Sequence, residues 1–137
     1  RGVSLSRPHT DFKKVNGIEY MRKANEDTLL ICQIESQKGV ENIQEIMAVN
    51  GIDGALIGPN DMTQDYSILN QFENPIIVDA FEQIIHAAKV KGKFSGVHFG
   101  NAEHLKPWLS KGMQFNMWNS DLGLLMKGAE FIKELKK

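Results

Sequence analysis

Two acidic residues, Glu35 and Asp61, stand just after short apolar runs that each predict a buried strand. The runs are LLICQI and GALI, and a segment of helix length separates them. In parallel α/β folds, functional groups gather at the carboxyl ends of the strands, and neighbouring strands lie about 4.8 Å apart. The two carboxylates can therefore converge on one point. Because like charges repel at that separation, the pattern predicts a divalent cation between them.

The expected ligands are oxygens, with no partnering cysteine and no clear histidine pair, and this favours a hard ion. Magnesium or manganese is the expected ion, with cobalt as a further candidate. Two protein carboxylates leave most of an octahedron open to water and a bidentate substrate, an arrangement suited to catalysis. One alternative stays open, because an acid that follows a strand often caps a helix or lies in a solvated loop.

Gln33 and Gly58 add to this pattern. Gln33 lies two residues before Glu35, so its side chain is expected on the same side of the strand. An amide on the inward face of an apolar strand needs a hydrogen-bond partner, which a substrate or a metal-bound water would provide. Gly58 opens the GPND turn, and its lack of a side chain allows the backbone to approach a small ligand closely.

The elements that position these residues alternate along the chain. The spacing of apolar residues and the turn residues that bound them predict strands at about 29–34, 53–58, 93–99 and 113–119. Helices are expected at 17–27, 38–49, 75–92, 101–112 and 120–137, and the PNDMTQDYSILNQFENP segment reads as a polar connector with a short helical turn. Strand and helix in alternation require a parallel sheet with helical crossovers.

The predicted fold class is therefore α/β. Four strand–helix units suit either a small doubly wound domain or the second half of a (β/α)8 TIM barrel. The chain begins at Arg1 with a loop-like stretch rather than an element. We therefore favour the barrel, with residues 1–137 as the C-terminal part of a single domain whose N-terminal half is absent.

Composition narrows the functional classes. The formal net charge of −1 gives no electrostatic footprint for nucleic acid or an anionic membrane. No apolar run approaches the roughly 20 residues that a membrane span needs, and no signal peptide opens the chain. Cys32 is the single cysteine, so no intrachain disulfide forms and a reducing, cytoplasmic compartment is expected. A small-molecule substrate is the expected partner.

Four segments together resemble the HpcH/HpaI aldolase family of metal-dependent, class II pyruvate aldolases. The segments are RG…SR, EYMRKANEDTLLICQIES, NGIDGALIGPNDM and WNSDLGLL, and the resemblance extends from Arg1 to the C-terminus. It implies a barrel of the phosphoenolpyruvate/pyruvate superfamily that makes or cleaves a carbon–carbon bond between a pyruvate enolate and an aldehyde. Substrates of the family include 2,4-dihydroxyhept-2-ene-1,7-dioate and 2-dehydro-3-deoxyglucarate. Its members are generally homo-oligomers, often hexamers built from dimers.

The resemblance also implies roles for individual residues. Glu35 and Asp61 become the metal ligands, and Gln33 lies by the pyruvyl group with a place in catalysis and binding. Asn60 offers its backbone amide to the carboxylate of the donor substrate. Gly58 and Pro59 shape the wall beside it. The catalytic arginine and the His–Asp pair of the family are expected before Arg1.

Several departures and alternatives accompany the resemblance. Trp118 and Asn119 replace smaller residues near the last strand and are expected to narrow the mouth of the site. His98 ends the third strand, where it either faces the site or is a hydrogen-bonded structural residue, and His86 and His104 are expected at the surface. Rival functions are a malyl- or citramalyl-CoA lyase, a macrophomate synthase-like decarboxylating enzyme, and an inactive half-barrel that only binds.

Overall fold

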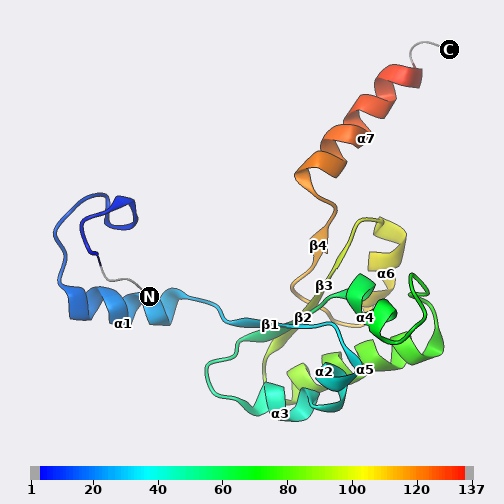
Figure 1. Cartoon of the computed structure of the whole chain (residues 1–137), viewed down its shortest axis with the longest axis horizontal. Coiled ribbons are helices and arrows are strands. Elements are labelled where there is room, and N and C mark those ends of the chain that lie inside the picture. The colour runs from blue at the N-terminus through cyan, green and yellow to red at the C-terminus, as the bar shows by residue number, and fades with distance from the viewer. Residues whose placement is uncertain (1–3, 135–137) are drawn as a thin grey trace.

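The computed structural model describes residues 4–134, and its centre is one parallel sheet of four strands in the order β1-β2-β3-β4. The strands are β1 (Ile31–Ile34), β2 (Gly54–Ile57), β3 (Phe94–Phe99) and β4 (Met117–Trp118). Helices separate them along the chain (Figure 1). This confirms the predicted α/β class and the repeated strand–helix units, in which consecutive strands lie side by side.

The helices begin and end largely where the sequence signals place them. They are η1 (Pro8–Thr10), α1 (Gly17–Asp27), α2 (Gln37–Glu41), α3 (Ile43–Ala48), α4 (Pro59–Asp65), α5 (Pro75–Val90), α6 (Ala102–Ser110) and α7 (Asp121–Glu134). Side chains that cap backbone N–H groups start α1, α2, α5 and α6 at Asn16, Ser36, Asn74 and Asn101, respectively. The predicted closing helix ran to residue 137, and its last three residues lie outside the described part.

One face of the sheet forms the core. Helix α5 contacts β2, β3 and α3, and α2, α3 and α5 all lie on the same side of the strands (Figure 1). At the carboxyl ends of β1 and β3, buried residues alternate with exposed ones, because successive side chains of a strand point to opposite faces. Ile34 and Val97 are buried against the helices, whereas their neighbours Gln33 and His98 are exposed on the opposite face.

Three elements differ from the sequence prediction. The helix expected at 38–49 is two helices, α2 and α3, broken at Asn42, whose side-chain Nδ2 donates to the Lys38 carbonyl at 2.7 Å. Asparagine competes for backbone partners in this way and disfavours a helix interior. The connector after β2 forms the seven-residue helix α4, with Pro59 in its first turn and Met62 fully buried. Such burial stabilises a helix that its polar composition does not predict.

The fourth strand is also shorter than predicted. Only Met117–Trp118 pair with β3 as a strand, although 113–119 was expected. The backbone N–H groups of Gln114 and Phe115 both donate to the Ser95 carbonyl, at 2.9 and 3.1 Å. Because both amides serve one acceptor, the segment before Met117 approaches β3 without a regular ladder.

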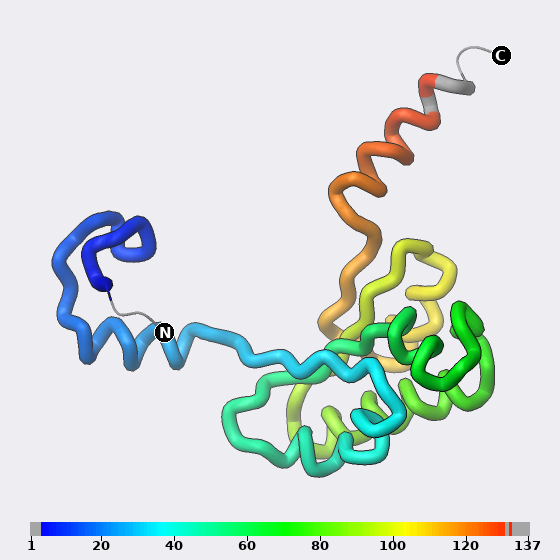
Figure 2. The backbone as a smooth tube through the Cα atoms, viewed as in Figure 1, coloured from blue at the N-terminus to red at the C-terminus, as the bar shows by residue number. Residues whose placement is uncertain are grey.

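Helices α1 and α7 extend away from the sheet in different directions (Figure 1, Figure 2). Helix α1 buries none of its residues, and Ile18 on its apolar face is 80% exposed. Leu122 and Leu125 of α7 are exposed as well. Among residues 4–134, no further strand pairs with the outer edges of β1 and β4, and no helix has the length and apolar character that a membrane crossing requires.

Candidate functional site

A cleft of about 200 Å³ opens at the carboxyl ends of the strands. Its volume lies below the 300 to 1,000 Å³ of most drug-sized ligand pockets, so it suits a ligand of few atoms. Polar side chains and apolar walls share the lining, which consists of Gln33, Leu56, Ile57, Gly58, Pro59, Asn60, Asp61, His98 and Met117. The five residues Gln33, Gly58, Pro59, Asn60 and Asp61, to which the resemblance gave roles in binding the metal or the substrate, therefore lie around a single cavity.

Glu35 lies beside this cleft, in contact with two lining residues. The Gln33 side-chain Nε2 donates a hydrogen bond of 2.5 Å to Glu35 Oε2. The contact follows from the strand geometry, since residues two apart project to the same side of a strand. The hydrogen-bond partner of the Gln33 amide is thus the Glu35 carboxylate, which follows the same strand. The amide holds that carboxylate next to the cleft.

Gly58 allows the turn between β2 and α4 to lie against this pair. Its N–H donates to the Ile34 carbonyl at 3.0 Å, which ties the end of β2 to the end of β1. A β-carbon added at position 58 would lie 3.0 Å from Glu35 Oε2 and 3.1 Å from Gln33 Nε2. The backbone approaches both side chains closely because glycine has no side chain.

Asn60 and Asp61 occupy the first turn of α4, after the buried Pro59. Both are exposed toward solvent and both line the cleft. The first N–H groups of a helix have no partner within the helix, and a carboxylate in the first turn interacts favourably with the helix dipole. The position of Asp61 is thus compatible with two roles, stabilising the start of α4 and binding a ligand in the cleft.

The donor set fits a hard divalent ion. Glu35 and Asp61 supply carboxylate oxygens, and Gln33 adds an amide at the same edge. Within residues 4–134, no group of three or more His, Cys, Asp or Glu side chains gathers as a metal site. A pair of carboxylates without a third protein ligand leaves coordination positions for water and substrate, as catalytic magnesium sites do.

His98 and Met117 complete the wall on the far side of β2. The two residues are register partners on β3 and β4, and both line the cleft. His98 Nε2 lies 3.0 Å from the Asn119 carbonyl oxygen. His98 therefore both faces the cleft and has a hydrogen-bond partner in the protein. Met117, which the sequence analysis did not single out, takes the place expected for Trp118. The Trp118 ring instead lies 5.0 Å from Lys127 Nζ, measured to the ring centroid, and is absent from the lining.

The two other histidines considered differ from each other. His86 on α5 is exposed, as predicted. His104 is half-buried, so it is less exposed than the surface position expected for it implies. Its ring lies 5.2 Å from the Phe72 ring and 5.7 Å from the Phe99 ring, between centroids. The aromatic contacts of α6 with β3 therefore account for His104.

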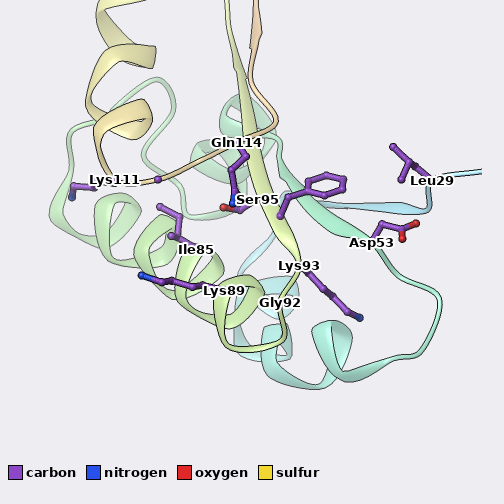
Figure 3. A pocket seen from close by; sticks show the side chains of 11 residues that line it. Leu29, Asp53, Ile85, Lys89, Gly92, Lys93, Ser95, Lys111 and Gln114 are labelled. Atoms are coloured by element: carbon purple, nitrogen blue, oxygen red, sulfur yellow. The ribbon is translucent and has the colours of Figure 1, made fainter.

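A larger hollow of about 710 Å³ lies at the opposite, amino-terminal end of the strands (Figure 3). Three of its four charged side chains already have protein partners. Asp53 accepts a hydrogen bond from the Leu30 N–H at 2.7 Å, Lys93 Nζ donates to the Val49 carbonyl at 2.7 Å, and Lys111 pairs with Glu82. The first two contacts connect loops and the third joins α5 to the end of α6. The smaller cleft, where carboxylate, amide and imidazole meet, is therefore the better candidate for chemistry.

The HpcH/HpaI aldolase/citrate lyase family model matches residues 9–128. This chain belongs to that family. The 5-keto-4-deoxy-D-glucarate aldolase of Escherichia fergusonii is 33% identical over 130 residues, which are 95% of this chain and 50% of that protein. The enzyme of the same name from Shigella dysenteriae is 31% identical over 137 residues, 100% of this chain and 53% of that protein. The resemblance read from the four segments is confirmed.

Solved structures give the same family and fold. The HpcH/HpaI aldolase from Desulfitobacterium hafniense superposes with a TM-score of 0.85 at 33% identity, over 100% of this chain and 53% of that one. An HpcH/HpaI aldolase/citrate lyase family protein from Burkholderia cenocepacia shares the fold with a TM-score of 0.87 at 24% identity, over the same shares. This HpcH/HpaI chain spans about half the length of the curated relatives it matches, and its four parallel strands match half of a TIM-barrel-like aldolase.

Proposed function

We propose that this protein is a metal-dependent aldolase that makes or cleaves a carbon–carbon bond between a pyruvate enolate and an aldehyde. One observation carries the proposal. Gln33 and Asp61 line a single cleft at the carboxyl ends of the strands, and Gln33 holds Glu35 beside that cleft by a hydrogen bond. Membership of the HpcH/HpaI family and relatives named as aldolases support this assignment.

Glu35 and Asp61 are the proposed ligands of a divalent ion, with magnesium or manganese as the first candidates and cobalt as a further one. A bound ion would polarise the keto group of pyruvate and make the methyl protons more acidic. The amide of Gln33 orients the Glu35 carboxylate. The backbone N–H of Asn60, in the first turn of α4, is the proposed partner of the donor carboxylate.

Gly58 and Pro59 shape the wall of the cleft beside the donor. Pro59 is buried, so its ring is fixed by the packing around it. A side chain at position 58 would occupy space next to Glu35 and Gln33. These two residues therefore hold the turn close to the substrate and restrict the cleft to a small donor such as pyruvate.

The proposed substrates are 2-keto-4-hydroxy acids. The relatives named 5-keto-4-deoxy-D-glucarate aldolase favour a sugar-acid substrate of that kind. A related substrate is 2,4-dihydroxyhept-2-ene-1,7-dioate. A malyl- or citramalyl-CoA lyase is the second candidate, favoured by the citrate lyase part of the family description. Assays with 5-keto-4-deoxy-D-glucarate and with the two CoA esters, in the presence of manganese, separate these candidates.

The metal site is tested without turnover by titrating Mn²⁺ into the full chain and recording its electron paramagnetic resonance signal. Glu35→Gln and Asp61→Asn each remove one charged ligand while keeping side-chain size, and each should weaken Mn²⁺ binding by at least about 100-fold. Glu103→Gln is the matched control, because Glu103 forms an exposed ion pair with Lys106 on α6. Unchanged Mn²⁺ affinity in both site variants would end the proposal.

We also propose that the protein works as a homo-oligomer. The outer edges of β1 and β4 pair with no strand among residues 4–134, and exposed strand edges recruit further chains. The apolar residues Leu122 and Leu125 of α7 are exposed on a helix that extends from the sheet. Contiguous exposed apolar surface of this kind marks interaction sites.

A further inference from the structure

His98 projects from β3 toward the cleft rather than toward the core. Its neighbours Val97 and Phe99 are both buried against the helices, whereas His98 is exposed. Side chains alternate across a strand, so His98 lies on the same face of the sheet as Gln33. It lines the cleft together with Gln33 and Asp61.

One nitrogen of the His98 ring forms a hydrogen bond within the protein. Nε2 lies 3.0 Å from the Asn119 carbonyl oxygen. A carbonyl can only accept, so Nε2 carries the proton and donates. In the neutral ring Nδ1 is then a hydrogen-bond acceptor, and among residues 4–134 it has no hydrogen-bond partner.

Asn119, which holds the ring, is itself fixed by several contacts. Its N–H donates to the Phe99 carbonyl at 3.0 Å, and its Oδ1 accepts from the Ser120 N–H at 2.9 Å. Its backbone is left-handed, with φ of 61°, a conformation that asparagine tolerates. A β-carbon at Gly123 would lie 2.0 Å from Asn119 Oδ1, so the start of α7 also accommodates this arrangement. The carbonyl that orients His98 is therefore rigidly placed.

We propose that His98 is a specificity-determining residue that binds, through Nδ1, a hydroxyl group on the aldehyde-derived part of the substrate. The inference rests on the proposed aldolase function. The other polar side chains of the lining, Gln33, Asn60 and Asp61, belong to the proposed metal and donor end. His98 stands one strand further along the sheet, beside the apolar Met117. A substrate that extends from the donor end along the sheet meets His98 as its next polar partner.

Two substitutions separate this role from a structural one. In His98→Gln, the side-chain Nε2 replaces the ring Nε2 and keeps a donor for Asn119, but the acceptor at the Nδ1 position is lost. In His98→Asn, the side-chain amide takes the Nδ1 position and the donor for Asn119 is lost. His86→Leu on the exposed surface of α5 is a control for removal of a histidine elsewhere.

The probes are a matched pair of keto acids, 4,5-dihydroxy-2-oxopentanoate and 4-hydroxy-2-oxohexanoate, in which a methyl group replaces the terminal hydroxyl. Dissociation constants are measured by isothermal titration calorimetry on the full chain with Mn²⁺ present. The natural chain and His86→Leu should prefer the dihydroxy acid by about five-fold, the effect of one neutral hydrogen bond. His98→Gln should show a ratio near one, and His98→Asn should retain the preference.

A second readout uses the histidine nitrogen resonances. The Nδ1 resonance of His98, assigned by its absence in His98→Gln, should shift when the dihydroxy acid binds, and should shift less with the methyl analogue. Equal affinity of the natural chain for the two acids, or a preference that survives His98→Gln and disappears in His98→Asn, would overturn the inference and leave the aldolase proposal standing. Failure of both acids to bind in the presence of Mn²⁺ would overturn the two together.

Discussion

The Gln33 amide donates a 2.5 Å hydrogen bond to Glu35 at the carboxyl end of β1. A hydrogen bond to a charged acceptor is stronger than one between neutral groups, so it restricts the carboxylate to a narrow range of orientations. Removing a group that orients a metal ligand typically lowers metal affinity by about 10- to 100-fold. The pair therefore supplies both a proposed ligand and its support within three residues of chain.

The close approach of Gly58 to this pair gives the first prediction. In Gly58→Ala, the added methyl group would lie 3.0 Å from Glu35 Oε2 and 3.1 Å from Gln33 Nε2, so one of the side chains must move. We expect Mn²⁺ affinity, measured by calorimetry, to fall about ten-fold. Gly100→Ala is the matched control, because Gly100 also follows a strand and a β-carbon there meets nothing within 4 Å. An affinity equal to that of the control would contradict the proposed support.

Gly96 gives a prediction about stability rather than binding. A β-carbon at this position of β3 would lie 1.5 Å from the Phe115 carbonyl oxygen, a backbone atom that no rotamer change can move. Gly96→Ala should lower the free energy of unfolding by about 3 kcal/mol, because overpacking forces the backbone apart. Urea denaturation followed by circular dichroism measures the change. In the same assay Gly100→Ala should cost less than about 0.5 kcal/mol, and a similar small loss for Gly96→Ala would show that the contact is absent.

Tyr66, at the C-terminal end of α4, gives a prediction about pH. Burial raises the pKa of the Tyr66 phenol above its ordinary value of 10.0, and the nearby carboxylates of Glu41, Asp65 and Asp79 raise it further. The unfolded chain therefore loses this proton at lower pH than the folded chain. The stability that the protonated phenol contributes is complete below pH 10 and is lost as the pH rises through the folded pKa.

The measurement for Tyr66 compares the natural chain with Tyr66→Phe in urea denaturation at pH 9 and pH 11. The natural chain should lose more free energy of unfolding over this interval, because the phenylalanine variant has no group to ionise at that position. Equal losses in the two proteins would show that the Tyr66 pKa is the same folded and unfolded.

The exposed face of α7 predicts self-association. The full chain should sediment as a species larger than its 15.4 kDa mass, with a concentration-dependent coefficient. Leu125→Glu places a charge on the exposed apolar face and should shift the population toward the monomer. Gln71→Glu adds the same charge at an exposed loop residue whose side-chain oxygen still accepts from Asn74. If Leu125→Glu and Gln71→Glu sediment alike, α7 takes no part in association.

Periodic patterns predicted most of the fold. Helix α5 was assigned correctly because its buried residues, such as Phe81 and Ile84, repeat at helical spacing behind Pro75. The break between α2 and α3 was missed because the apolar spacing continues across Asn42, whose side chain donates to the Lys38 carbonyl where the first helix ends. Only a short helical turn was expected where α4 forms, because the composition of that segment is polar and the helix is stabilised by tertiary burial of Met62.

The part of the site that depends only on the positions of residues along one strand was predictable. Gln33 and Glu35 follow β1 directly, and their contact needs only the two-residue period of a strand. The wall formed by Met117 was not predictable in this way, because it depends on the register between β3 and β4. A shift of one residue would have placed Trp118 in the cleft instead, and nothing in the local sequence fixes that register.

Both proposed ligands lie in one continuous segment that runs from the end of β1 to the first turn of α4, which has consequences for folding. Loop closure within so short a stretch costs little entropy compared with joining distant parts of a chain. The ion's coordination shell can thus assemble early, while the remaining strands are still being added. An ion bound at that stage would stabilise the nascent unit through mass action. Raising the manganese concentration should then accelerate refolding as well as slow denaturation.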